Sequence, residues 1–364
     1  MNKFMYTIGC CLVCLLPKAQ SGPLRLGIAG LSHSHVHGLL SRKNSGDIQI
    51  VGIYESDTAL AHRYGRQYNL PQHIFYISLQ KMIQRAKPEA VAAFGSIYDH
   101  LQVVQAAAPQ GIHVMVEKPL AVNMKHARAM EALAKKHSIH LLTNYETTWY
   151  PSNHKAFELL QQGAVGPLRK LVVRDGHKGP KKIGVNPEFL NWLTDPVLNG
   201  GGALTDFGCY GANLATWLLQ GKRPNTVTCV TQQLQTQNNP RVDDEANILL
   251  TYDSAVALLQ PSWNWPMGRK DMEVYGLTGA LFADHSGTLR MRTAQGYSDY
   301  KEQTFELANR QAPFDDPFAF LSAVVRRQTT LPTWDLSSLE NNLLVVEILD
   351  AARKSAKKGK TLKL

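Results

Sequence analysis

Leu24-Arg25-Leu26-Gly27-Ile28-Ala29-Gly30 is the stretch of sequence that decides the fold. This short apolar run predicts a buried strand that turns at Gly30, and we expect a helix to begin near His35. In parallel α/β domains phosphate groups bind at such a turn, because the start of the helix offers free N–H groups and the positive end of its dipole. The stretch therefore predicts a nucleotide-binding domain.

The same alternation of short apolar runs and helical patterns continues to residue 142. Further strands are predicted over 48–54, 90–95, 112–116 and 139–143, and helices over 58–68, 100–108 and 124–137. Strands that alternate with helices imply a parallel sheet wrapped by crossover helices. We assign this Rossmann dinucleotide-binding domain to residues 21–145.

After Pro151 the pattern changes to strands that follow one another with few helices. These strands are predicted over 169–174, 225–232, 246–252, 256–260, 270–276 and 280–284. An amphipathic helix over 338–358, from a Ser338 cap to Gly359, closes the chain. The fold class expected is α/β: the Rossmann domain, then an α+β domain over 146–364 with a large open, mostly antiparallel sheet.

The first twenty residues have the layout of a secretory signal peptide. Lys3 gives a basic start, residues 4–16 are almost unbroken apolar, and small and polar residues follow from Pro17. A buried core helix is the alternative, and the run is short of the ~20 apolar residues that span a bilayer. We therefore expect the protein to be exported to the periplasm. If these residues are not a leader, the protein is expected in the cytoplasm.

Cysteine usage and charge argue against two classes of protein, the disulfide-stabilised scaffolds and the nucleic-acid-binding proteins. Three of the five cysteines lie in the predicted leader, which leaves Cys209 and Cys229. We expect these two to be buried thiols rather than one disulfide bridge. The formal net charge is +10. The basic residues are scattered and form no stripe with interleaved aromatics, so we expect no nucleic-acid partner.

The predicted phosphate-binding turn keeps part of the usual glycine fingerprint. In the register of G-x-G-x-x-G the chain has Gly30, Ser32 and His35. Glu55 follows Gly30 by 25 residues, at the end of the second strand. An acid there takes the ribose hydroxyls of NAD and repels the 2′-phosphate of NADP, so NAD is the expected cofactor.

Three alternating histidines after the first strand raise a rival interpretation. His33, His35 and His37 contain the His-x-His pair that metal-dependent hydrolases of the amidohydrolase type carry at this place. Such sites need further ligands at later strand ends of a barrel, and the second half of this chain is not barrel-like. We therefore expect no metal.

A strand over 112–116 runs directly into Glu117-Lys118-Pro119. This arrangement resembles the signature of the Gfo/Idh/MocA family, named for glucose-fructose oxidoreductase, inositol dehydrogenase and rhizopine catabolism. Other segments between residues 24 and 364 resemble the same family: Ser96–His100, Gly200–Tyr210, Val242–Asp244 and Ala351–Gly359. The chain departs from the family pattern in its lost glycines and in Tyr210, where histidine is commoner.

The resemblance implies a set of cofactor-binding residues and an assembly. The implied cofactor contacts come from Gly30, Ser32, His33, Ser34, Glu55, Ser96, His100, Glu117 and Lys118. Members of the family often form oligomers through the open C-terminal sheet, so a homo-oligomer is expected.

Alcohol oxidation requires a hydride acceptor, which nicotinamide supplies, and a group that takes the hydroxyl proton. The candidate is Tyr210, beside Lys118, whose ammonium would lower the pKa of the phenol from its usual value of about 10. Asp206 lies four residues before Tyr210 and could orient Lys118 or hold a substrate hydroxyl, although a helix cap is its alternative role. Four further residues are expected to bind substrate: Trp149, Arg174, His177 and Trp192.

These features together predict an NAD-dependent oxidoreductase that acts on a CH–OH group of a sugar, glycoside or polyol. One alternative is a redox-neutral enzyme that oxidises a hydroxyl transiently to permit elimination or epimerisation, for which the cofactor would stay tightly bound. The other is a non-catalytic binding protein on the same scaffold. The presence of both Lys118 and Tyr210 argues against the last.

Overall fold

The computed structural model describes residues 22–43 and 45–364, so the predicted leader lies outside the described residues. The first half of the chain forms a six-stranded sheet in the order β3-β2-β1-β4-β5-β6, in which every pair is parallel. Its strands are β1 (Leu24–Ala29), β2 (Ile48–Tyr54), β3 (Phe75–Tyr76), β4 (Ala90–Ala93), β5 (His113–Glu117) and β6 (Leu141–Asn144). This is the strand order of a Rossmann domain, and it confirms the expected fold.

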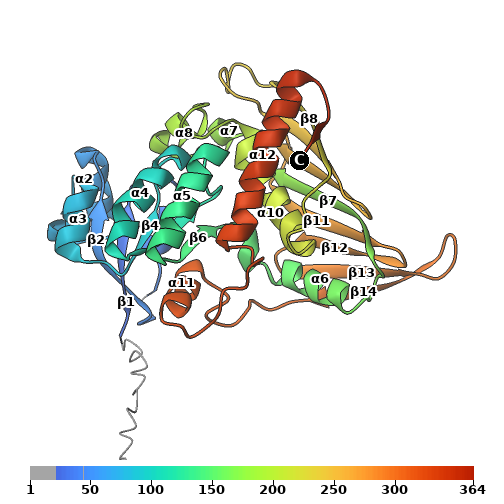
Figure 1. Ribbon diagram of the computed structural model, residues 1–364, viewed down its shortest axis with the longest axis horizontal. Helices are drawn as coiled ribbons and strands as arrows, with labels where there is room; N and C mark the ends of the chain where they lie inside the picture. Colours follow the sequence, from blue (N-terminus) through green and yellow to red (C-terminus); the bar gives the residue numbers. More distant parts are fainter. Residues whose placement is uncertain (1–21, 44) are drawn as a thin grey trace, which may run out of the picture.

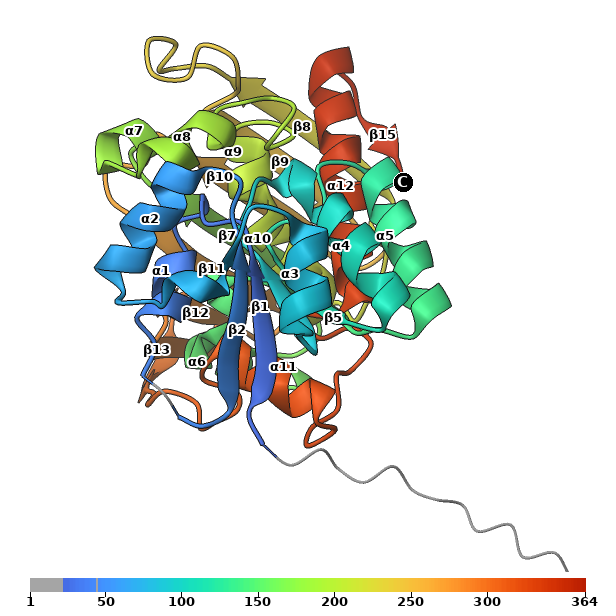
Figure 2. The ribbon, with the colours of Figure 1, turned by 90° about the vertical axis from the view of Figure 1, so that its left-hand side faces the viewer.

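Helices cover both faces of this sheet, as Figure 2 shows. One face packs against α3 (Leu79–Ala86), α4 (His100–Ala107) and α5 (Met124–His137). The other packs against α1 (Val36–Leu40), α2 (Thr58–Gln67) and α11 (Pro317–Val325), which returns from late in the chain. Helix α11 belongs to the second predicted domain but packs on the sheet of the first, so the two domains are in contact through it.

The second sheet has nine strands in the order β14-β13-β12-β11-β7-β10-β9-β8-β15. It contains β7 (Leu168–Gly176), β8 (Thr226–Gln232), β9 (Glu245–Thr251), β10 (Val256–Ser262), β11 (Arg269–Gly276), β12 (Gly279–His285), β13 (Thr288–Ala294), β14 (Tyr300–Glu306) and β15 (Leu362–Lys363). The β7–β10 pair is parallel and the other pairs are antiparallel, which confirms the mostly antiparallel sheet.

Three long helices lie on one face of this sheet, as Figure 1 shows. They are α6 (Pro151–Gln161), α10 (Gly208–Leu218) and α12 (Leu339–Lys358). The predicted closing helix is confirmed together with its ends, because the Ser338 side chain accepts a hydrogen bond from the Asn341 N–H and Gly359 adopts a left-handed conformation. Cys209 and Cys229 are both buried free thiols, as expected.

The expectation of few helices after Pro151 was wrong for the segment that precedes β8. Besides α6 and α10, this segment forms the short helices α7 (Pro180–Ile183), α8 (Pro187–Leu193) and α9 (Ala203–Asp206). Such short helices carry too few residues for a clear 3.6-residue periodicity. None of the helices in the described part of the chain combines the length and apolar character that a bilayer-spanning segment needs.

Candidate active site

The carboxyl end of β5 meets α9 at a buried ion pair. Lys118 follows Glu117, the last residue of β5, and its Nζ lies 2.5 Å from Asp206 Oδ1 and 3.1 Å from the Asp206 carbonyl oxygen. The second carboxylate oxygen of Asp206 accepts a hydrogen bond from Trp263 Nε1 at 3.0 Å. Lys118 is 5% exposed and Asp206 is 4% exposed, so the pair is shielded from water.

Asp243 holds the start of α9 in place and so positions Asp206. Its two carboxylate oxygens accept the N–H groups of Gly202 and Leu204 at 2.9 and 2.7 Å. A Cβ at Gly202 would meet the Asp243 carbonyl oxygen at 1.8 Å, so this position needs glycine. The resemblance noted at 200–210 and 242–244 thus corresponds to two segments that contact each other.

Each member of the Lys118–Asp206 pair stabilises the charge of the other. Burial opposes both charges, but the Asp206 carboxylate outweighs it and raises the pKa of Lys118. Burial is likewise outweighed at Asp206, where the Lys118 ammonium lowers the pKa of the carboxyl. Lys118 therefore stays an ammonium at neutral pH, which suits a hydrogen-bond donor to a substrate oxygen.

Tyr210 lies under two ammonium groups but is not ionised by them. Lys118 Nζ lies 5.2 Å and Lys270 Nζ 5.5 Å from the centre of its ring. The side chain is 1% exposed, and burial, followed by the nearby charge of Glu146, raises the pKa of the phenol well above its usual value. The expectation that the pKa of Tyr210 is lowered was wrong, because burial and the neighbouring negative charges penalise the phenolate.

The turn after β1 has the close backbone approach that a nucleotide-binding turn requires. Gly30 adopts a φ of +84°, and a Cβ there would meet the backbone nitrogen of Gly95 at 2.7 Å. Ser32 Oγ accepts a hydrogen bond from Trp192 Nε1 at 3.1 Å, and the Ser34 carbonyl accepts one from the His37 N–H at 3.2 Å. The first glycine of the fingerprint is therefore needed, while the serines form the path into α1.

Glu55 links the ends of β1 and β2. Its carboxylate accepts the Leu31 N–H at 2.8 Å and the Asp57 N–H at 2.9 Å. Burial raises the pKa of this carboxyl, and the two backbone hydrogen bonds act against that shift. The acid thus lies where the sequence places it, at the end of the second strand.

Ser96 and His100 belong to the loop after β4. Ser96 forms a capping box with Asp99, which begins the turn that leads into α4. His100 is fully buried, its Nδ1 lies 3.1 Å from the Leu120 carbonyl oxygen, and burial lowers its pKa to about 4. Near neutral pH His100 is therefore uncharged and holds the chain just after Lys118.

His33, His35 and Glu117 bring three potential metal-ligand atoms within 4.8 Å of one another. The contacts among them are those of hydrogen bonds: His35 Nδ1 lies 2.8 Å from Glu117 Oε2, and His33 Nδ1 accepts the His35 backbone N–H at 3.1 Å. A neutral His33 that accepts at Nδ1 carries its proton on Nε2, which has no lone pair there for a cation. Asn144 completes this network by donating to Glu117 Oε1 at 2.8 Å.

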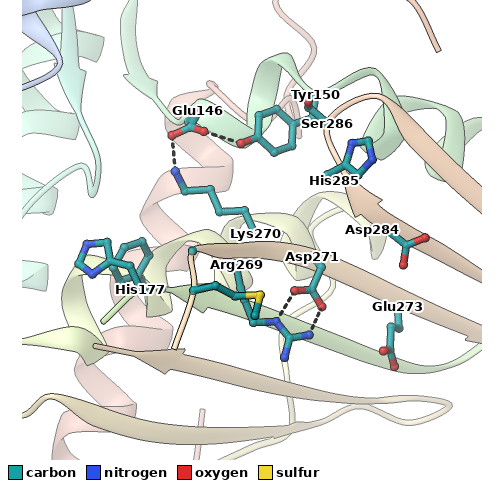
Figure 3. A pocket seen from close by; sticks show the side chains of 14 residues that line it. Glu146, Tyr150, His177, Arg269, Lys270, Asp271, Glu273, Asp284, His285 and Ser286 are labelled. Carbon is teal, nitrogen blue, oxygen red and sulfur yellow. Dashed lines mark hydrogen bonds and ion pairs between the residues drawn. The ribbon is translucent and has the colours of Figure 1, made fainter. Parts of the chain in front are cut away.

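A cavity of about 640 Å³ opens next to Phe207, the residue that follows Asp206, between the start of the second domain and the ends of β7, β11 and β12 (Figure 3). Lys270 reaches across it to pair with Glu146, which also accepts a hydrogen bond from the Tyr150 hydroxyl. The cavity is lined by Glu146, Tyr150, Gly176, His177, Phe207, Met267, Gly268, Arg269, Lys270, Asp271, Glu273, Asp284, His285 and Ser286.

Of the four predicted substrate-binding residues, His177 lines this cavity. It contacts the ring of Phe207 edge-on, with ring centres 5.0 Å apart, and Phe207 in turn lies 5.6 Å from Lys118 Nζ. His177 Nδ1 accepts the Gly179 N–H at 3.0 Å, which leaves Nε2 as the donor of the neutral ring. Burial lowers the pKa of His177, so the neutral ring prevails near pH 7.

Arg174, Trp149 and Trp192 lie outside the cavity. Arg174 points to the face of the sheet opposite Lys270, where it pairs at 2.6 Å with Glu273, a residue of the cavity lining. Trp149 donates to Asn144 Oδ1 at 3.1 Å and packs edge-on against Phe320. Trp192 donates a hydrogen bond to Ser32, so it lies at the turn after β1 and not at the cavity.

Glu146, Tyr150 and Lys270 are site residues that sequence reasoning missed. A signal was present, because Glu146 and Tyr150 follow the last predicted strand of a parallel sheet, where ligand-binding loops gather. Lys270 carries no such signal, since its place depends on how β11 pairs with β7.

Family models match both halves of the chain. Residues 24–145 match the oxidoreductase family with an NAD-binding Rossmann fold, and residues 153–282 match the GFO/IDH/MocA C-terminal domain. Among curated proteins, trans-1,2-dihydrobenzene-1,2-diol dehydrogenase of Sus scrofa is 27% identical over 236 residues, which are 64% of this chain and 66% of that enzyme. The Bos taurus enzyme is 28% identical over the same shares of the two chains. The chain thus matches just under two thirds of the length of these relatives.

Solved structures share the whole fold. An aldose-aldose oxidoreductase from Caulobacter crescentus, complexed with glycerol, superposes with a TM-score of 0.77 at 22% identity, over 94% of this chain and all of that one. An inositol dehydrogenase homologue from Azotobacter vinelandii, complexed with NAD+, gives 0.78 at 18% identity, over 94% and 97%. With both domains matched and this fold shared, the chain belongs to the GFO/IDH/MocA family of NAD-binding oxidoreductases.

Proposed function

We propose that this oxidoreductase acts on a CH–OH group of a sugar, glycoside or polyol. The observation that carries the proposal is the buried Lys118–Asp206 pair, which is connected through Phe207 to a cavity rich in polar side chains. Glu146, Tyr150 and Lys270 present hydrogen-bond donors and acceptors side by side, which is the lining that a polyhydroxylated ligand needs. The relatives named above support the proposal, since their names describe acting on a diol, an aldose or inositol.

The residues around the first strand fit a nicotinamide dinucleotide. Gly30, packed against the backbone of Gly95, keeps the tight turn of the glycine fingerprint, and the Glu55 carboxylate lies at the end of β2, where the ribose hydroxyls would bind. Glu117 ends β5 and Lys118 follows it, so both lie at the carboxyl edge of the parallel sheet, where the reacting ring of the cofactor would be expected. When bound, the nicotinamide supplies the hydride acceptor.

Lys118 and Tyr210 share the handling of the proton. Both hold their protons at neutral pH, so in the reducing direction they donate hydrogen bonds to the carbonyl oxygen of the substrate. For oxidation, one of the two groups must first lose its own proton to solvent, and it then accepts the hydroxyl proton as the hydride leaves. Asp206 orients the ammonium of Lys118 and keeps it charged.

A redox-neutral reaction is the second candidate, favoured by the predicted leader over residues 1–20. An exported enzyme has no cellular pool that would reoxidise its cofactor. A tightly bound NAD that takes the hydride from one hydroxyl and returns it after elimination or epimerisation needs no such pool.

The assembly we propose is a homo-oligomer formed through the open face of the nine-stranded sheet. Val230 and Leu249 lie on this face, 63% and 40% exposed, on paired strands β8 and β9. Light scattering of the wild type and of a Val230→Lys variant tests it, since a charge inside the interface would dissociate the assembly. Unchanged mass would place the interface elsewhere.

One experiment decides between the candidate functions. The purified protein is incubated with a panel of sugars, glycosides and polyols while nicotinamide absorbance and product masses are followed. Net NADH formation identifies a dehydrogenase. A new product without net NADH identifies the redox-neutral reaction: its mass changes after elimination, and after epimerisation its chromatographic retention changes while its mass stays the same. Turnover of nothing in the panel, with ligands bound and released unchanged, would contradict both and leave a binding protein. Lys118→Ala is the inactive control.

A further inference from the structure

Asp175 is a buried acid that faces the active site from β7. In the pairing of β7 with β11 it lies directly opposite Lys270, and residues directly opposite one another point to the same face of a sheet. That face is the one toward the site, because Lys270 lies over the ring of Tyr210 and pairs with Glu146. The next pair along, Arg174 and Asp271, points to the other face, and because Asp271 also lines the cavity, the cavity borders β11 on both faces.

The carboxyl of Asp175 has no hydrogen-bond partner among the described residues, at either oxygen. The residue is 2% exposed, so water from the surface does not satisfy it. Asp244, which is equally buried, shows the usual arrangement: its oxygens accept the N–H groups of Leu234 and Gln235, both at 2.7 Å. A buried polar group without a partner is costly, and it calls for a functional explanation or an absent ligand.

Lys270 does not neutralise Asp175, because its ammonium is held by Glu146 on the far side of the cavity. Burial therefore raises the pKa of the Asp175 carboxyl well above its usual value, and Asp271 and Glu146 add to the shift while Lys270 and Lys118 act against it. The charged and titratable groups that face it are Lys118, Glu146, Tyr150, Cys209 and Lys270. A carboxyl in these surroundings keeps its proton to higher pH than an ordinary aspartate, and in the protonated form it can donate a hydrogen bond.

We propose that Asp175 is a further substrate-binding residue, whose protonated carboxyl donates a hydrogen bond to a second hydroxyl oxygen of the substrate, near Tyr150 and Lys270. Asp175 lies behind the residues that line the cavity: Gly176, which follows it in β7, and Lys270, which lies opposite it in β11, both line it. The inference rests on the proposed function in taking the ligand to be a polyol. It adds a binding group that Lys118 and Tyr210 do not supply.

The first test is independent of turnover. Protein labelled with ¹³C at the aspartate carboxyls is titrated by NMR, and the Asp175 signal is assigned from its loss in Asp175→Asn. We expect this signal to report a protonated carboxyl at pH 7 and to shift when D-glucose or myo-inositol is added. Titration of Asp175 in the ordinary aspartate range overturns the inference, and so does a signal that neither polyol moves.

The second test uses whichever of D-glucose, methyl β-D-glucoside and myo-inositol the enzyme turns over. Asp175→Asn keeps an N–H donor and should stay within about threefold of the wild-type KM, whereas Asp175→Leu should raise KM on the order of tenfold, the effect of one lost hydrogen bond. Asp253→Asn, in an exposed turn where its partner is Asn225, is the matched control.

Deoxy analogues and pH locate the contact. For one monodeoxy analogue of the chosen polyol, the wild type and Asp175→Leu should have equal KM values, because this analogue lacks the hydroxyl that Asp175 binds. The wild-type KM should rise with pH as the carboxyl loses its proton, and this limb should vanish in Asp175→Asn. Equal KM values for all variants on every analogue would overturn the role of Asp175, while failure of the wild type to turn over any of the three would count against the proposed function instead.

Discussion

Lys118 Nζ and Asp206 Oδ1 lie 2.5 Å apart in a space from which water is excluded, and they join the two domains of the chain at the point where the reaction is proposed to occur. The lysine comes from the end of a parallel strand in the first domain and the aspartate from a short helix in the second. The geometry of the pair therefore depends on the docking of one domain on the other. A buried pair of this kind contributes to specificity of position more than to stability.

Lys118→Met should abolish turnover and destabilise the fold. It leaves the Asp206 carboxylate buried with Trp263 as its remaining side-chain partner, and removal of one member of a buried pair costs roughly 3–5 kcal/mol. Urea denaturation measures the free energy of unfolding, and a cofactor titration shows whether NAD still binds. The double variant Lys118→Met/Asp206→Leu should recover much of the stability and none of the activity. Wild-type turnover in either variant would remove Lys118 from the mechanism.

Tyr210→Phe should lower kcat by about 10²–10⁴-fold and change KM much less, because a proton-handling group acts in the chemical step. The substitution keeps the ring between Lys118 and Lys270, so the packing of α10 is preserved. Steady-state kinetics on the best substrate of the panel provides the measurement. An effect confined to KM would instead make Tyr210 a substrate-binding residue.

Most of the first domain could be predicted from sequence, because each buried strand and amphipathic helix of a βαβ unit carries its own local pattern. The prediction omitted β3, which has two residues, and α3, although Leu79, Met82, Ile83 and Ala86 follow a clear helical spacing. The second domain was less predictable, since α7, α8 and α9 are too short to show a period.

The part of the site that lies on the sheet could not be read from sequence, because it depends on which face each side chain takes. Leu171, Val172 and Val173 are all buried, so the apolar pattern of β7 does not reveal which residues point toward the site. We expected Arg174 to line the cavity, but the pairing with β11 places Asp175, and not Arg174, on the same face as Lys270. The ionisation of Tyr210 was misjudged for a related reason, since burial depends on the packed structure and not on the neighbouring lysine alone.

Glu55 should make the enzyme prefer NAD to NADP. The carboxylate is fixed by the N–H groups of Leu31 and Asp57, so it cannot swing away from a 2′-phosphate. Like charges brought together cost enough to weaken NADP binding by at least about tenfold relative to NAD. Fluorescence titrations with both cofactors measure the ratio, and Glu55→Gln should narrow it. Tighter binding of NADP by the wild type would contradict the assignment.

Asp47 should stabilise the fold at neutral pH and lose that effect in acid. The Arg42 guanidinium, which also reaches Asp316 at the start of α11, lowers the pKa of Asp47 to about 2. A lowered carboxyl pKa stabilises the fold above the unfolded value near 4, and the contribution disappears as pH falls toward 2. Because the pair is partly exposed, we expect Asp47→Asn to cost roughly 1 kcal/mol at pH 7. Urea denaturation at pH 7 and at pH 3 measures both values, and a cost that does not shrink in acid would contradict the ion pair as its cause.

Export and a bound cofactor form one prediction, because an enzyme outside the cytoplasm cannot draw on the nicotinamide pool of the cell. If residues 1–20 direct export, NAD must stay in the site through many turnovers, and each hydride taken from a hydroxyl must return within the same site. The mature chain, expressed without added cofactor and then denatured, should release close to one nicotinamide per chain, and the host's periplasmic fraction should contain the shortened protein. A full-length cytoplasmic protein that is purified free of nucleotide and turns over with added NAD would contradict both export and the closed hydride cycle, and would leave an ordinary dehydrogenase.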